Sequence, residues 1–195
     1  MNSQQENNNY FAVIDTETNW RNEVMSIGVV VSDDDTFEIV DKRYYILTPE
    51  YAVQGMFSSV LYNHLPQNGI EVSREDAIMD LKSFLNEYGV KWIFAYNASF
   101  DYNHLPELQD YQWYDIMRIA SYKQYNDKID EADCGPSGRL RRNYGVEGIA
   151  RLLVCADYCE KHNALDDAMD ELLFVMKPLK RKIEDYIPFE PKKRM

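Results

Sequence analysis

An apolar run of five residues, 10–14, is followed by two carboxylates one residue apart, Asp15 and Glu17. The run is rich in β-branched and aromatic side chains, which favours a buried strand. Side chains alternate across a strand, so Asp15 and Glu17 project from the same face. Two negative charges this close require a cation, and Mg²⁺ and Mn²⁺ prefer such oxygen ligands. Acidic residues also end strands in solvated turns, and the pair alone does not separate the two interpretations.

A second segment, residues 91–101, joins an apolar strand through Ala95 to a polar turn and Asp101. Asn97 and Ser99 are both residue types that cap helices. If Ser99 is the N-cap, Asp101 lies in the first helical turn, where the helix dipole favours a carboxylate. Asp101 is therefore either a further metal ligand or a residue that only stabilises the start of a helix.

A third segment places His162 directly before a predicted helix. A neutral imidazole beside an activated water accepts a proton near physiological pH, so His162 is a candidate general base, although a single His before a helix is more often a surface residue. Asp166 and Asp167 both lie away from the apolar stripe, so helical periodicity does not choose between them. The residues of the predicted stripe are Leu165, Ala168, Met169, Leu172 and Met176.

In order and spacing, the three segments resemble the DEDDh branch of the DnaQ-like 3′-to-5′ exonucleases. This branch includes RNase T-like enzymes and proofreading domains of the DNA polymerase III epsilon type. Its motif D-x-E-T is similar to residues 15–18, Asn-x-x-F-D to residues 97–101, and H-x-A-x-x-D to residues 162–167, which selects Asp167. Weaker similarities extend over residues 10–177. Trp20 and Tyr96 depart from the family, which often has Gly and His at these positions.

The resemblance implies an α/β fold of the ribonuclease H-like type, in which α-helices flank a mixed β-sheet whose first three strands are antiparallel. It also implies two divalent metal ions, Mg²⁺ or Mn²⁺, about 4 Å apart. Asp15 would bridge both ions, Glu17 and Asp167 would complete one site, and Asp101 would hold the second ion. His162 would deprotonate the attacking water.

Substrate contacts are also implied by the resemblance. Thr16, Thr18 and Trp20 follow or lie within the first motif, and Asn97 and Phe100 belong to the second. These five residues are expected to bind the terminal nucleotide, with stacking on an aromatic ring worth about 1–3 kcal/mol per base. For Trp20, burial in the core is the competing interpretation.

The remaining pattern predicts an α/β layer architecture. Three apolar segments, residues 10–14, 24–31 and 37–47, indicate consecutive strands, and the short connections between them suggest an antiparallel meander. Ser73 then begins an amphipathic helix that ends at Gly89, its predicted C-cap. Alternating helices and strands follow Ala95.

The length of 195 residues and the apolar content of 45% predict one compact domain. We expect a disordered polar lead over residues 1–9, an exonuclease domain over 10–177 and a basic segment over 178–195. No apolar stretch of about 18 residues and no signal-like N-terminus are present, so membrane insertion and secretion are not expected. Three cysteines without zinc-like spacing predict reduced thiols and a cytoplasmic location.

The net charge of −12 argues against a generic nucleic-acid-binding surface. Bound metal ions would offset local acidity, and an exonuclease that holds a few terminal nucleotides needs few phosphate contacts. Arg139, Arg141 and Arg142 form one basic group, which fits a substrate-strand contact and a solvated surface equally well. For the basic C-terminal segment, a solvated end is favoured over a docking site for a partner.

The expected function is metal-dependent 3′-to-5′ exonuclease activity on the 3′ ends of single-stranded DNA or RNA, with DNA weakly favoured through the likeness to proofreading enzymes. One alternative is a catalytically silent protein that binds nucleic acid. Another is a proofreading subunit tethered to a polymerase, whereas a free monomer or homodimer would favour an independent nuclease. All five predicted metal and base residues are present, which argues against the silent alternative.

Overall fold

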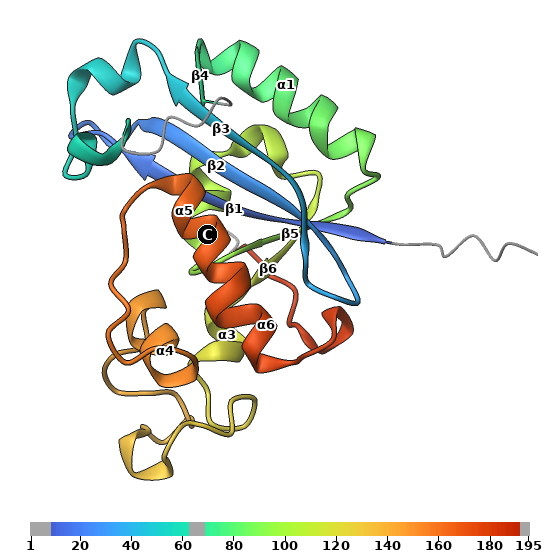
Figure 1. Ribbon diagram of the computed structural model, residues 1–195, viewed down its shortest axis with the longest axis vertical. Coiled ribbons are helices and arrows are strands. Elements are labelled where there is room, and N and C mark those ends of the chain that lie inside the picture. Colours follow the sequence, from blue (N-terminus) through green and yellow to red (C-terminus); the bar gives the residue numbers. More distant parts are fainter. Residues whose placement is uncertain (1–8, 63–68, 192–195) are drawn as a thin grey trace, which may run out of the picture.

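The computed structural model describes residues 9–62 and 69–191. Its centre is a six-stranded sheet in the order β4-β3-β2-β1-β5-β6 (Figure 1). The first three strands are antiparallel, as predicted, whereas β4, β5 and β6 pair in parallel with their neighbours. The predicted mixed sheet is therefore confirmed. The strands are β1 (Tyr10–Thr18), β2 (Val24–Asp33), β3 (Ile39–Leu47), β4 (Gly69–Val72), β5 (Trp92–Ala95) and β6 (Gln112–Asp115).

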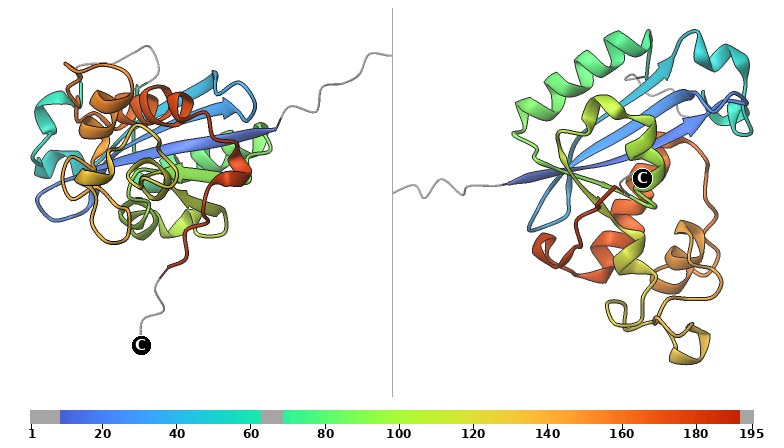
Figure 2. Two further views of the ribbon diagram at one scale, coloured as in Figure 1. Left: turned by 90° about the horizontal axis from the view of Figure 1, so that it is seen from below. Right: turned by 180° about the vertical axis from the view of Figure 1, so that it is seen from behind.

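Helices lie on both faces of this sheet. Seen from below, the sheet separates the C-terminal helices from the green helix α1 (Figure 2, left). The α-helices are α1 (Arg74–Glu87), α2 (Ser99–His104), α3 (Met117–Ala120), α4 (Val146–Leu153), α5 (Ala164–Asp170) and α6 (Lys177–Leu179). The π-helical segment η5 (Glu171–Met176) joins α5 to α6, and the 3₁₀ turns are η1 (Glu50–Val53), η2 (Ser58–Val60), η3 (Pro106–Leu108), η4 (Glu131–Asp133) and η6 (Ile183–Asp185).

Alternation along β1 divides the core into two layers. Phe11 and Val13 pack in the layer that contains the apolar side of α5 and η5. Ala12 and Ile14 pack in the opposite layer, with the buried side of α1. The same alternation directs Asp15 and Glu17 toward the α5 side, which agrees with the expected common face.

Gly28 decides how closely α5 approaches the sheet. A Cβ atom at Gly28 would lie 2.1 Å from the carbonyl oxygen of Ala164, so only glycine permits this contact. The side chain of Asn163 accepts hydrogen bonds from the backbone N–H groups of Leu165 and Asp166 and so caps α5. Its amide also donates to the Tyr44 hydroxyl at 3.1 Å. These contacts hold the start of α5 against β2 and β3, beside the carboxylates of β1.

Two predicted boundaries differ from the structure. Strand β3 begins at Ile39, not at residue 37, because Phe37 has a φ of 56° in a turn closed by its N–H donating to the Asp33 carbonyl. Helix α1 starts as predicted, with the Ser73 hydroxyl accepting from the Asp76 N–H. Its C-cap is Tyr88, and Gly89 follows with a φ of 62°.

The C-terminal segment packs on the sheet through residues 183–189. Tyr186 is buried, and its ring meets the Phe94 ring edge-on, with 5.1 Å between the centroids. The Phe189 N–H donates to the Trp113 carbonyl at 2.7 Å. The expectation of a solvated C-terminal end is therefore wrong at Ile183 and Tyr186, which are both buried.

Part of the predicted segmentation falls outside the described residues. This applies to residues 1–8 of the polar lead and to residues 192–195 of the basic segment. Within the described residues, none of the helices has the length and apolar character needed to span a lipid bilayer.

Candidate active site

The first motif lies on β1, which continues through Thr18 and so carries both carboxylates within the strand. Asp15 pairs in register with Gly28 of β2, and Glu17 with Ser26. Burial raises the pKa of Glu17 to about 8, and the nearby charge of Asp167 adds to the shift. The pKa of Asp15 is raised well above its usual value by burial and by the neighbouring carboxylates, with Asp101 first among them.

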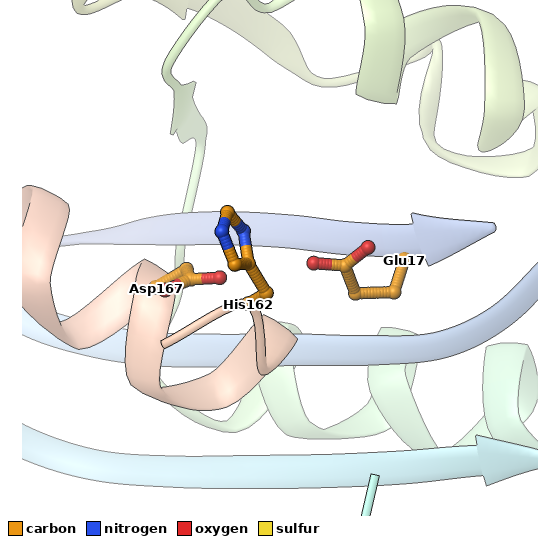
Figure 3. Close-up of side chains that lie close together, drawn as sticks. All are labelled: Glu17, His162 and Asp167. Atoms are coloured by element: carbon orange, nitrogen blue, oxygen red, sulfur yellow. The ribbon is translucent and has the colours of Figure 1, made fainter. Parts of the chain in front are cut away.

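The third motif meets the first at the start of α5. Ligand atoms of Glu17, His162 and Asp167 all lie within 4.8 Å of one another. Figure 3 shows the carboxylates of Glu17 and Asp167 on either side of the His162 ring. Asp167 is only 3% exposed, and burial followed by the charge of Glu160 raises its pKa to about 7. Its Oδ1 atom is buried without a hydrogen-bond partner among the described residues.

The second motif contributes Asp101, a buried residue in the first turn of α2. Its Oδ1 atom accepts a hydrogen bond of 2.8 Å from the Thr16 hydroxyl. Burial raises the pKa of Asp101 to about 7, although this hydrogen bond favours the charged form. The predicted capping is wrong, because the N-cap position of α2 is occupied by Ala98, whose side chain has no acceptor.

The sequence interpretation missed Glu171, which is only 2% exposed. Its Oε2 atom accepts a 3.2 Å hydrogen bond from the Tyr96 backbone N–H. Burial raises the pKa of Glu171 well above its usual value, and the charges of Asp101 and Asp167 add to the shift. The sequence feature that could have identified Glu171 is its spacing: it follows Asp167 by four residues and so lies near it on a helical surface.

Phe57 and Asp115 were also missed. The ring of Phe57 stacks on His162, with the centroids 3.9 Å apart. Asp115 ends β6, and its Oδ1 atom accepts from the backbone N–H groups of Asn97 and Met117 at 3.1 and 3.0 Å. Asp115 therefore holds the turn of the second motif. No local sequence pattern identifies Phe57, because its contact with His162 joins distant segments.

The predicted substrate residues occupy different environments. Thr16 is buried and bonded to Asp101, whereas Thr18 is partly exposed. Trp20 is 67% exposed, so the competing interpretation of a core residue is wrong. Asn97 and Phe100 are exposed on the loop and first turn that carry the second motif. Of the five residues, Thr16 is thus bonded to a carboxylate of the cluster, while Trp20, Asn97 and Phe100 are exposed and Thr18 is partly exposed.

The donors of this cluster fit hard divalent cations. Carboxylate oxygens are the preferred ligands of Mg²⁺ and Mn²⁺. Burial and then mutual repulsion raise the pKa of Asp15, and the buried Oδ1 atom of Asp167 lacks a hydrogen-bond partner in the described residues. A bound cation would relieve the repulsion between the carboxylates, and the Oδ1 atom of Asp167 would coordinate it.

Comparison with known proteins finds similar solved structures but no similar sequence. No protein-family model and no curated protein matches the sequence. The nuclease domain of 3′hExo, a DEDDh family member bound to rAMP, has a TM-score of 0.63 and 16% identity, covering 95% of this chain and 98% of that chain. A full-length 3′-exonuclease has a TM-score of 0.61 and 15% identity, with coverage of 96% and 93%.

A more distant likeness is to E. coli Exonuclease I in complex with a dA16 oligonucleotide, with a TM-score of 0.55 and 14% identity. The alignment covers 91% of this chain but only 42% of that one. Both alignments cover most of this chain, and its mixed sheet fits the ribonuclease H-like architecture expected from the motifs. The chain therefore has the fold of the DEDDh 3′-to-5′ exonuclease domains.

Proposed function

We propose that the protein is a metal-dependent 3′-to-5′ exonuclease that hydrolyses phosphodiester bonds at the end of a single strand. The observation that carries the proposal is the convergence of Glu17, His162 and Asp167 within 4.8 Å. Besides burial, the charges of Asp101 and Asp167 raise the pKa values of both Asp15 and Glu17, so the four carboxylates repel one another. The exonuclease-like fold supports the same reaction.

Asp15, Glu17, Asp101 and Asp167 would hold two divalent ions, Mg²⁺ or Mn²⁺. Bound there, the ions would supply positive charge to the attacking and leaving oxygens of an in-line displacement. The Thr16 hydroxyl fixes the orientation of Asp101 through its 2.8 Å hydrogen bond. The second motif is held in turn by Asp115, whose carboxylate accepts from the backbone that leads into α2.

His162 would accept the proton of the attacking water. Its ring lies against Phe57 and next to the carboxylates of Glu17 and Asp167. A base must lie within hydrogen-bonding reach of the proton that it removes, so a fixed ring orientation serves this role. The exposed ring of Trp20 would stack on a terminal base.

The test is degradation of 5′-labelled single-stranded DNA and RNA with Mg²⁺, Mn²⁺ or EDTA. We expect a metal-dependent ladder that shortens from the 3′ end and is lost in Asp15→Asn. The exposed residue Asp35 provides a matched control, since Asp35→Asn removes the same charge outside the cluster. Absence of cleavage of both polymers with either metal would refute the proposal. We expect DNA to be the better substrate, and the paired RNA reaction tests that preference directly.

A further inference from the structure

A pocket of about 740 Å³ lies between α4 and the loop that precedes it. Four cationic side chains line it, together with two carboxylates, Asp130 and Asp133. The chain as a whole carries a net charge of −12, so this local excess of positive charge is unusual for the molecule. We call it the arginine pocket, defined by Lys128, Arg141, Arg142 and Arg151.

The cations of the arginine pocket are only partly neutralised. Arg151 forms an ion pair of 2.9 Å with Glu147, and Arg141 donates to the Ala132 carbonyl at 3.2 Å. The charged groups of Lys128 and Arg142 have no hydrogen bond or ion pair within residues 9–62 and 69–191. All four residues are exposed, and the charges of Lys128 and Arg142 are the most available to an anion.

Tyr144 directly follows Asn143, which lines the pocket, and contacts of Tyr144 lead from there to the candidate active site. The guanidinium of Arg139 lies 4.2 Å from the centre of the Tyr144 ring, which is 41% exposed. The Tyr144 carbonyl accepts a hydrogen bond from the Tyr96 hydroxyl. The backbone N–H of Tyr96 in turn donates to Glu171 in the carboxylate cluster. Figure 1 shows α4 and the loop that precedes it together below α5.

We infer that the arginine pocket binds the phosphate backbone of the substrate strand upstream of its reacting 3′ end. This inference rests on the proposed function. Guanidinium groups match phosphate oxygens in charge and in bidentate geometry. Tyr144, which follows the lining residue Asn143 and bonds to Tyr96, offers an exposed aromatic surface on which a base can stack. A long strand therefore gains contacts in the pocket that a short one cannot reach.

The test measures binding without catalysis, by fluorescence anisotropy in EDTA with the full chain. The probes are labelled single strands of about 5 and about 20 nucleotides, lengths that bracket common single-strand sites. For Arg141→Gln/Arg142→Gln we expect about tenfold weaker binding of the long strand and unchanged binding of the short one. The salt slope for the long strand should fall by about 1.4, or about 0.7 for each lost phosphate contact.

The matched control is Lys82→Gln/Lys91→Gln, which removes the same charge on α1 and before β5. The inference is overturned if this control weakens the long strand equally, or if the arginine variant leaves its affinity and salt slope unchanged. Circular dichroism of both variants tests whether they keep the fold of the wild-type protein.

The same preparation separates this inference from the proposed function. Degradation of the short strand with Mg²⁺ reports on the carboxylate cluster alone. If the wild-type protein degrades neither strand but shows the length-dependent binding, the proposed function fails, and only the binding of a single strand by the arginine pocket stands. If it degrades both strands without a length-dependent effect of the arginine variant, the pocket inference fails.

Discussion

The imidazole of His162 lies flat against the ring of Phe57, with 3.9 Å between the centroids and 11° between the planes. Phe57 belongs to the segment after β3, which also contacts the end of the first motif. The Trp20 N–H donates to the Gln54 carbonyl at 2.9 Å. A Cβ atom at Gly55 would lie 2.5 Å from the Thr18 carbonyl oxygen. One segment therefore touches both the first and the third motif.

We predict that Phe57→Ala lowers kcat by about 10- to 100-fold, because a loosened base loses its alignment with the attacking water. Phe57→Tyr retains the ring and should remain close to wild type. Single-turnover rates at saturating oligonucleotide measure the effect, and the NMR signals of the His162 ring report its environment. A wild-type kcat in Phe57→Ala would show that the stacking has no catalytic role.

Stability of the metal-free protein should fall as the pH rises from about 4 to about 8. The folded-state pKa is raised to about 8 for Glu17 and to about 7 for Asp101 and Asp167. The folded state therefore binds more protons than the unfolded state in this window, and the stability present at low pH is lost as these groups ionise. Thermal unfolding in EDTA measures the fall, which Mg²⁺ should reduce. A flat profile in EDTA would contradict the prediction.

Glu171→Gln should stabilise the metal-free protein at pH 8 and weaken metal binding about 10- to 100-fold, an amount that partners around a metal site commonly contribute. The amide oxygen retains an acceptor for the Tyr96 N–H, while the substitution removes a charge that adds to burial in raising the pKa of Asp15. Unfolding curves in EDTA and calorimetric titration with Mn²⁺ measure the two effects. Unchanged affinity for Mn²⁺ would separate Glu171 from the metal site.

Gly28→Ala should destabilise the fold by about 3 kcal/mol, since its new methyl group would meet the Ala164 carbonyl at 2.1 Å. Gly145→Ala is the matched control, because a Cβ atom there has no neighbour within 4 Å. Urea unfolding of both variants gives the difference in free energy. Equal stability of the two variants would show that α5 moves away from β2 without cost.

The sequence by itself determined the strand–helix pattern and the identity of the three motifs. Alternation along residues 10–17 predicted one face for Asp15 and Glu17, and Ser73 predicted the start of α1; both are local properties of the chain. The antiparallel start of the sheet followed from short connections between apolar segments.

Only the tertiary structure decided which distant groups surround the motifs. Glu171, Phe57 and Asp115 reach the motifs through contacts between segments that are far apart in the sequence. The sequence likewise did not determine whether Trp20 is buried or exposed, and the structure shows it exposed. Periodicity reports which face of an element is apolar. The burial and the neighbours of a polar side chain depend instead on how closely separate elements pack. Gly28, for example, permits the close approach of α5 to the sheet.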